Sequence, residues 1–179
     1  MKKLLSIVLS MFLCFSVGIT AFAADNDLPF SDSEMTISEA AEILGIDESE
    51  IGGMEIRRLP EQNNNARSIP SVLERGVYYE DFEADTFVGA IHRLNGTKFK
   101  YGMKQMSYSG YGYTLAFFLN YTDPARPIPT QILLSNSKPR YDSPLYNINY
   151  GEEIYFNYFY SDGGSKPAEA IIRLAIMVY

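Results

Sequence analysis

From Val72 onward, apolar and polar residues alternate with a period of two, and this pattern limits the possible folds more than any other feature. Its clearest case is a C-terminal face made only of aliphatic side chains: Ile172, Leu174, Ile176 and Val178. Successive side chains of a β-strand point to opposite faces, so this spacing predicts a strand. Burying each of these side chains contributes about 1.5–3 kcal/mol. We therefore expect the last strand to lie in the centre of a sheet.

The same alternation predicts more strands between residue 72 and the C-terminus. They are expected around Val77 and Tyr79 and over residues 87–94, 97–103, 111–121, 132–135 and 154–160. Asn95-Gly96 has the composition of a two-residue turn, so residues 87–94 and 97–103 are expected to form a hairpin. Seven to eight short strands separated by turns predict a mostly β fold, an antiparallel β-sandwich or a partly open barrel.

A short helix is predicted before this region. Thr36 and Glu39 have the spacing of a capping box, and Gly45 follows the apolar stripe as a C-terminal cap. Residues 37–48 resemble the first helix of a helix-turn-helix DNA reader, but no basic recognition helix follows. We interpret the segment as a surface helix that docks its apolar stripe on the sheet.

The sequence predicts that the chain is divided into four segments. Residues 54–59 predict a short strand, and residues 60–71, with two prolines and three consecutive asparagines, predict a linker. The expected organisation is a signal peptide at 1–23, a small helical segment at 24–59, the linker at 60–71 and the β-sandwich domain at 72–179.

Residues 1–23 have the pattern of a cleavable export signal. Lys2 and Lys3 precede an apolar run, and a small-residue frame ends at Ala23. A positive start, a short apolar core and an A-x-A frame are typical of a secretory signal peptide. We expect cleavage after Ala23, which would leave 156 of the 179 residues in a secreted or cell-surface protein.

The mature chain is acidic and contains no cysteine. Loss of Lys2 and Lys3 with the signal leaves 13 basic against 22 acidic residues, a net charge of −9. Nucleic acids and anionic lipid surfaces require a basic face, so neither is an expected partner. Cys14 lies in the signal and His92 is the only histidine, so we expect no metal and no cofactor. A lack of disulfides in an exported chain is typical of a bacterial extracellular protein.

Tyrosine is the residue type in excess, and every tyrosine lies at or after Tyr78. Some of them fall in Gly-, Asn- and Pro-rich segments, where side chains are usually exposed. Aromatic rings with polar neighbours bind sugars or peptides by stacking and by hydrogen bonds from their hydroxyl groups. The candidate ligand-binding residues are therefore Tyr108, Tyr111, Tyr141 and Tyr146. The competing interpretation is that residues 107–113 form a glycine-rich turn leading into a core strand.

No residue is assigned a catalytic role. The densest acidic group is Glu80, Asp81, Glu83 and Asp85. We interpret it as a solvated charged turn, with a calcium site or the paired carboxylates of a glycosidase as alternatives. His92 lies in a predicted strand and is interpreted as structural, because no nucleophile motif accompanies it.

Two function classes remain open. The first is a secreted, non-enzymatic binding or surface-associated module that contacts a cell-wall carbohydrate or an extracellular protein through tyrosine-rich loops. The second is a small secreted hydrolase that acts through the acidic residues near 80–85. The missing nucleophile motif favours the first class, and the oligomeric state is not encoded in any recognisable pattern.

Overall fold

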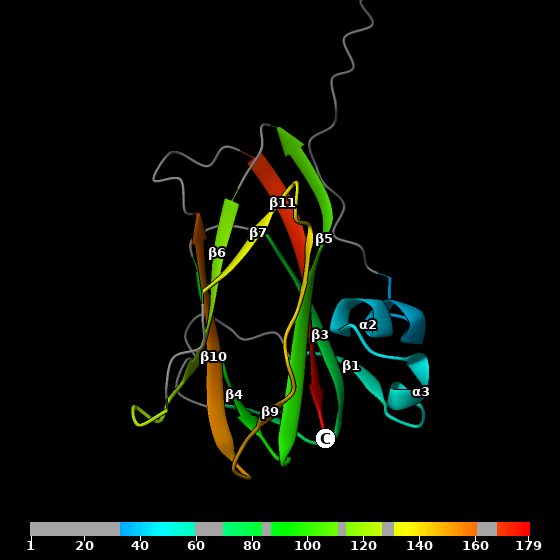
Figure 1. The fold of residues 1–179 in the computed structure, drawn as a ribbon, viewed down its shortest axis with the longest axis vertical. Coiled ribbons are helices and arrows are strands. Elements are labelled where there is room, and N and C mark those ends of the chain that lie inside the picture. The colour runs from blue at the N-terminus through cyan, green and yellow to red at the C-terminus, as the bar shows by residue number, and fades with distance from the viewer. Residues whose placement is uncertain (1–32, 60–69, 84–86, 111–113, 127–130, 161–167) are drawn as a thin grey trace, which may run out of the picture.

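Two β-sheets pack face to face, and two short helices lie on the outer side of one of them (Figure 1). The computed structural model describes residues 33–59, 70–83, 87–110, 114–126, 131–160 and 168–179. The fold is mostly β and sandwich-like, which confirms the expected fold class. The signal peptide and Tyr111 lie outside the described residues, as do residues 60–69 of the expected linker.

The described strands number eleven, against the seven to eight expected, because several edge strands are only two to four residues long. Sheet A has the order β1 (Ile56–Arg58), β3 (Gly76–Glu83), β11 (Ala168–Val178), β5 (Lys98–Gly110) and β8 (Arg140–Asp142), with β9 (Tyr146–Asn147) also paired to β5. Sheet B has the order β2 (Ser71–Leu73), β4 (Phe87–Leu94), β10 (Glu152–Tyr160), β6 (Thr114–Tyr121) and β7 (Ile132–Ser135). Both sheets are mixed rather than purely antiparallel, because β1 and β2 pair in parallel with β3 and β4.

The last strand is central, as its aliphatic face predicted. β11 pairs with β3 on one side and with β5 on the other. Ile172, Leu174, Ile176 and Val178 face sheet B and join the main core. The opposite face of β11 is buried as well, since Ala175 and Met177 pack in a second core under the helices. Both faces of this strand therefore exclude water.

The expected hairpin at Asn95-Gly96 is wrong. β4 belongs to sheet B and β5 to sheet A, so these two residues carry the chain from one sheet to the other. Neither residue has the positive φ that a type I′ turn requires. A Cβ on Gly96 would lie 2.5 Å from the carbonyl oxygen of Tyr179, so glycine is needed here for close packing against the chain end.

Helix α2 (Ile37–Leu44) begins and ends where the sequence predicted. The Thr36 hydroxyl accepts a hydrogen bond from the Glu39 amide at 3.2 Å, and Gly45 closes the helix with a φ of 63°. A shorter helix, α3 (Glu48–Ile51), follows it. α2 crosses β5 at Gly102, where a Cβ would overlap the carbonyl oxygen of Ile43. Glycine at this position therefore lets the helix lie directly on the sheet.

The N-terminal segment is joined to sheet A through β1, which pairs with β3. The Leu59 amide also donates to the Tyr79 carbonyl at 2.7 Å. At the far end of the expected linker, Ser71 is the first residue of β2. Within the described part of the chain, no helix is long and apolar enough to cross a membrane.

Candidate functional site

The structure places the candidate tyrosines in two different environments. Tyr108 lies near the end of the long strand β5 and is 43% exposed. Tyr141 on β8 and Tyr146 on β9 are half-buried and pack against the main core. The ring centroid of Tyr101 lies 6.0 Å from that of Tyr141 and 6.1 Å from that of Tyr146. The structure therefore brings Tyr141 and Tyr146 together around a buried ring and leaves Tyr108 elsewhere.

Tyr101 was not singled out by the sequence analysis. Its side chain is fully buried, and its hydroxyl has no hydrogen-bond partner among the described residues. Burial raises the pKa of Tyr101 above its usual range, and the phenols of Tyr146 and Tyr141 raise it further. The ring is therefore neutral at physiological pH. The sequence predicted a strand over residues 97–103, but only the pairing of β5 with β8 and β9 brings the rings of Tyr141 and Tyr146 next to Tyr101.

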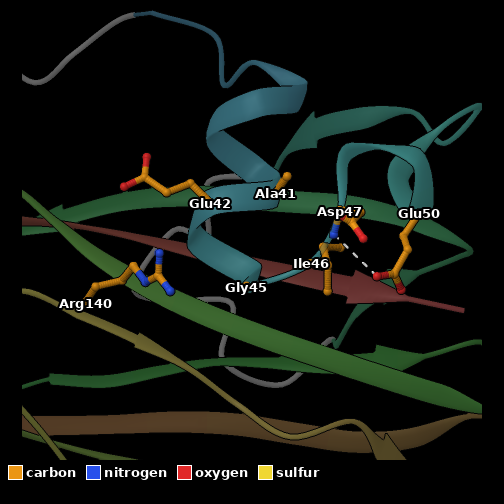
Figure 2. A pocket seen from close by; sticks show the side chains of 7 residues that line it. All are labelled: Ala41, Glu42, Gly45, Ile46, Asp47, Glu50 and Arg140. Atoms are coloured by element: carbon orange, nitrogen blue, oxygen red, sulfur yellow. Dashed lines mark hydrogen bonds between the residues drawn. The ribbon is translucent and has the colours of Figure 1, made fainter.

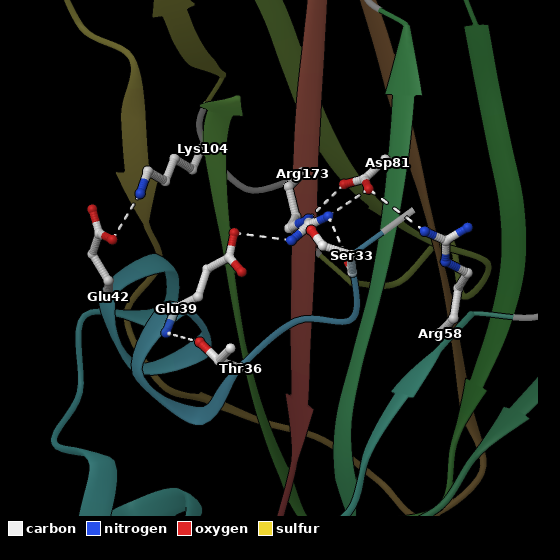
Figure 3. A network of polar contacts seen from close by, with 8 residues as sticks. All are labelled: Ser33, Thr36, Glu39, Glu42, Arg58, Asp81, Lys104 and Arg173. Carbon is white, nitrogen blue, oxygen red and sulfur yellow. Dashed lines mark hydrogen bonds and ion pairs between the residues drawn. The ribbon is translucent and has the colours of Figure 1, made fainter. Parts of the chain in front are cut away.

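The described members of the acidic group, Glu80, Asp81 and Glu83, lie in a strand rather than in a solvated turn. Glu80 to Glu83 belong to β3, and the Asp81 side chain is only 2% exposed. Figure 3 shows the contacts that compensate this burial: the Arg173 guanidinium donates to the two carboxylate oxygens of Asp81 at 2.6 and 2.7 Å. Arg173 also donates to Glu39 at 2.9 Å, so the Glu39 carboxylate binds the sheet rather than the helix terminus. Strand pairing creates this network, because Asp81 and Arg173 are opposite each other on β3 and β11.

Glu80 and Asp81 point to opposite faces of β3, so they do not form the carboxylate pair of a glycosidase. Glu80 is on the face of Tyr78 and Phe82, toward sheet B, and its cross-strand neighbour is Leu174. Burial raises the pKa of Glu80 to about 7, and the charge of Asp81 adds to this shift. A retaining or inverting hydrolase needs its two carboxyl groups on either side of one bond. Glu83 is exposed, and Asp85 lies outside the described residues.

His92 is a core residue of sheet B. It is 2% exposed and lies on the inner face of β4 with Leu94. Burial lowers the pKa of His92 to about 4, so the imidazole is neutral at physiological pH. Its Nδ1 atom has no hydrogen-bond partner among the described residues. Over the described parts of the chain, no group of three or more His, Cys, Asp or Glu side chains is placed to hold a metal ion.

A shallow pocket of about 390 Å³ opens beside the helices (Figure 2). Its lining includes three acidic side chains and one arginine. The lining residues are Ala41, Glu42, Gly45, Ile46, Asp47, Glu50 and Arg140. The charged groups are already engaged, since Glu42 binds Lys104 at 2.7 Å and Arg140 lies 3.4 Å from Asp142. Glu50 accepts from the Asp47 amide at 3.4 Å. Because its charged groups already have partners within the protein, we do not take this pocket as the candidate site.

The outer side of sheet B is the larger candidate surface, and we name it the open face. Both helices lie beside sheet A in Figure 1, so no described helix covers this side. Alternation from the buried residues of each strand shows which side chains point outward: Val72, Ile91, Arg93, Phe118, Asn120, Leu133, Glu153, Tyr155 and Asn157. Val72 is 50% and Leu133 45% exposed. The sequence predicted a strand over residues 154–160, but strand pairing was needed to assemble the face.

At the centre of the open face, rings and amides alternate. Tyr155 is opposite Asn120, and Asn157 is opposite Phe118 on the neighbouring strand. Two rings therefore occupy one diagonal of a square and two amides the other. The Asn157 Oδ1 atom is buried without a hydrogen-bond partner among the described residues. The Asn120 amide donates to the Phe118 carbonyl at 3.3 Å.

No family model matches the sequence, and no curated protein matches it. Two solved structures are similar to part of the chain. An acidic stable capsid structure of Helicobacter pylori bacteriophage KHP30 has 11% identity and a TM-score of 0.39, over 57% of this chain and 86% of that one. Aeromonas hydrophila PliG, a periplasmic lysozyme inhibitor of g-type lysozyme, has 7% identity and a TM-score of 0.37, over 71% of this chain and 100% of its own. At these scores neither likeness bears on what this chain does.

Proposed function

We propose that this chain is a non-enzymatic binding module that acts outside the cell and contacts its partner through the open face. The observation that carries the proposal is the centre of sheet B, over which no described helix lies and where half-buried rings lie beside an amide oxygen that has no partner among the described residues. Most sheets of a sandwich bury one face and leave the other polar. Here the outer face keeps aromatic rings, which are the residues that dominate binding energy at interfaces.

The candidate tyrosines fit this proposal unequally. Tyr108 is exposed and remains a candidate contact outside the open face. Tyr141 and Tyr146 pack on Tyr101 and on the main core, so truncating either ring would also disturb packing. The hydrolase alternative is weakened, because the adjacent carboxylates Glu80 and Asp81 point to opposite faces of their strand. We therefore place the contact on the open face.

Cosedimentation with a purified bacterial cell-wall fraction tests the proposal. The variants are Tyr155→Ala on the open face and Tyr150→Ala, a 71% exposed tyrosine outside the face. We expect the wild type and Tyr150→Ala to sediment with the wall and Tyr155→Ala to stay in solution. Release of soluble sugar by the wild type would instead support the hydrolase alternative. Equal retention of all three proteins would show that the open face is not the contact.

Export is proposed from the signal pattern of residues 1–23. The test is the mass of the protein in the culture medium of an expressing bacterium. We expect a chain that begins at Ala24. A protein retained with membranes and carrying Met1 would contradict both the cleavage and the extracellular site of action.

A further inference from the structure

We propose that the open face binds a neutral polysaccharide, with Tyr155 and Phe118 as stacking rings and Asn157 as a hydrogen-bonding partner for sugar hydroxyls. This inference rests on the proposed binding function and names the class of ligand. It is based on three observations: the arrangement of the rings, the Asn157 Oδ1 atom that has no hydrogen-bond partner among the described residues, and the neutral charge of the face.

The rings are arranged for a ligand with alternating apolar and polar groups. Tyr155 and Phe118 are diagonal neighbours on β10 and β6, with Asn120 and Asn157 on the other diagonal. Diagonal neighbours of this kind in a sheet lie about 7–8 Å apart, within reach of aromatic side chains. A sugar ring presents C–H groups on its faces and hydroxyls around its edge. The C–H face can pack on an aromatic ring while the hydroxyls reach the adjacent amides.

Asn157 has a hydrogen bond left to make. Its Oδ1 atom is buried and has no partner among the described residues, and a buried unmet acceptor costs about 1–3 kcal/mol. The residue as a whole is only half-buried, and the terminal torsion of an asparagine is broad. Rotation about that torsion can bring the oxygen to a ligand on the face. A sugar hydroxyl supplies the missing donor.

Charge favours a neutral ligand. On the open face Arg93 and Glu153 neutralise each other, with 2.6 Å between Nη2 and Oε1. The face is therefore neutral, whereas the whole chain has a net charge of −7. A polyanion would be repelled by the molecule, and a cationic partner would find no unpaired carboxylate among the described residues of this face.

The order of polar and apolar side chains argues against a protein partner. Protein interfaces usually have an apolar centre surrounded by a polar rim. On the open face the amides Asn120 and Asn157 share the centre with the rings of Tyr155 and Phe118, whereas the exposed aliphatic residues Val72 and Leu133 lie on the outer strands β2 and β7. A dimer interface of the usual kind would have aliphatic residues rather than amides at its centre.

Binding to insoluble neutral polysaccharides tests the inference, with cellulose, chitin and mannan as probes and soluble polygalacturonate as the anionic control. We expect retention on at least one neutral probe and none on the anionic one. Tyr155→Ala and Phe118→Ala should each weaken binding by about tenfold, and Asn157→Ala by about fivefold. Tyr155→Phe keeps the ring and should retain most of the binding. Tyr150→Ala, outside the face, should bind as the wild type does.

Several outcomes would overturn the inference. One is absence of binding to every neutral probe, and another is binding that Tyr155→Ala and Phe118→Ala leave unchanged while their melting temperatures stay near that of the wild type. A dimer in sedimentation velocity that dissociates on Tyr155→Ala would assign the face to a second copy. Cell-wall binding that depends on Tyr155 but survives excess soluble oligosaccharide from that wall would keep the proposed function and reject the sugar ligand.

Discussion

The outer face of sheet A is covered by helices, whereas no described helix covers the outer face of sheet B. On sheet A, the helices α2 and α3 cover the face and bury a second core that includes Leu44 and Met177. On sheet B, the open face has no described helix over it, although Tyr155 and Phe118 are as apolar as many core residues. The difference lies in the side chains that each face presents. Gly102 and Ala175 leave room for a helix on sheet A, whereas rings stand out from sheet B.

The two faces also differ in how they carry charge. Arg173 on sheet A is fully buried and pairs with Asp81 and Glu39. Arg93 on the open face is 46% exposed and pairs with Glu153. A buried ion pair cannot lose one member without leaving a desolvated charge, whereas an exposed pair is screened by water. The same residue type is therefore expected to matter very differently on the two faces.

Replacement of Arg173 should have the largest effect. Arg173→Ala removes both short hydrogen bonds to the buried Asp81 carboxylate, leaves it with Arg58 at 3.8 Å, and should lower the free energy of unfolding by about 3–5 kcal/mol. The matched change on the open face, Arg93→Ala, should cost about 0–1 kcal/mol. Urea unfolding at pH 7 measures both values. Equal losses would show that the two faces do not differ in the way the burial of these pairs indicates.

Core packing under the helices gives the next largest effect. Leu44 is fully buried in α2, and Leu44→Ala should lower the free energy of unfolding by about 2–5 kcal/mol. Leu133→Ala, at a 45% exposed position on the open face, should change it by less than about 0.5 kcal/mol. Thermal unfolding followed by circular dichroism distinguishes them. A small loss for Leu44→Ala would mean that the helices add little to the stability of sheet A.

The inner faces of the two sheets should respond to pH in opposite directions. Glu80 on sheet A has a pKa raised from 4.5 to about 7, so its protonated form stabilises the fold below pH 4.5 and this contribution is lost as the pH rises through 7. His92 on sheet B has a pKa lowered from 6.5 to about 4, so stability is lost as the pH falls from 6.5 through 4. The two slopes oppose each other, and the wild type should be nearly flat between pH 4.5 and 6.5.

Single substitutions should separate the two contributions to the pH dependence of the free energy of unfolding. Glu80→Gln leaves His92 as the titrating member of this pair, and its contribution to the free energy of unfolding should fall by about 2–3 kcal/mol from pH 6.5 to pH 4. His92→Gln leaves Glu80, and its contribution should fall by a similar amount from pH 4.5 to pH 7. Urea titrations across this range measure both. Parallel curves for the two variants would refute the assignment.

Aromatic truncation should give the smallest effect. Tyr146→Ala removes ring contacts with Phe99 at 5.2 Å and with Tyr101, and should cost about 1–2 kcal/mol. Tyr155→Ala on the open face should cost less than about 1 kcal/mol, because its half-buried ring belongs to neither core cluster. Melting temperatures of the two variants provide the comparison. A larger loss for Tyr155→Ala would mean that its ring is part of the folded core rather than a contact surface.

Elements governed by neighbouring residues could be predicted from the sequence. The bounds of α2 follow from Thr36 and Gly45, which satisfy backbone groups within one turn of the helix. The centrality of β11 follows from an aliphatic face that no edge strand could hide from water. β7 was predicted over the same residues that form it, Ile132–Ser135, and a turn closed by hydrogen bonds between Ser135 and Lys138 follows it.

Features that depend on residues distant in the sequence could not be predicted in this way. Asn95-Gly96 has the composition of a hairpin turn, but glycine is required at position 96 by close packing against Tyr179, which is distant in the sequence. The acidic run at 80–85 gave no sign that Asp81 would face Arg173, because 92 residues separate the two side chains. Likewise, Tyr141 and Tyr146 lie in a loop-like stretch and became half-buried only through pairing with β5.

Composition and periodicity by themselves determined that this is an acidic, mostly β chain with a capped helix and a buried last strand. Both act within a few residues, through side-chain alternation and hydrogen bonds to adjacent backbone groups. Only the tertiary structure decided which sheet the helices cover, where Arg173 finds its carboxylates and which rings remain on an open face. Those outcomes depend on register and sheet order, which set contacts between residues far apart in the chain.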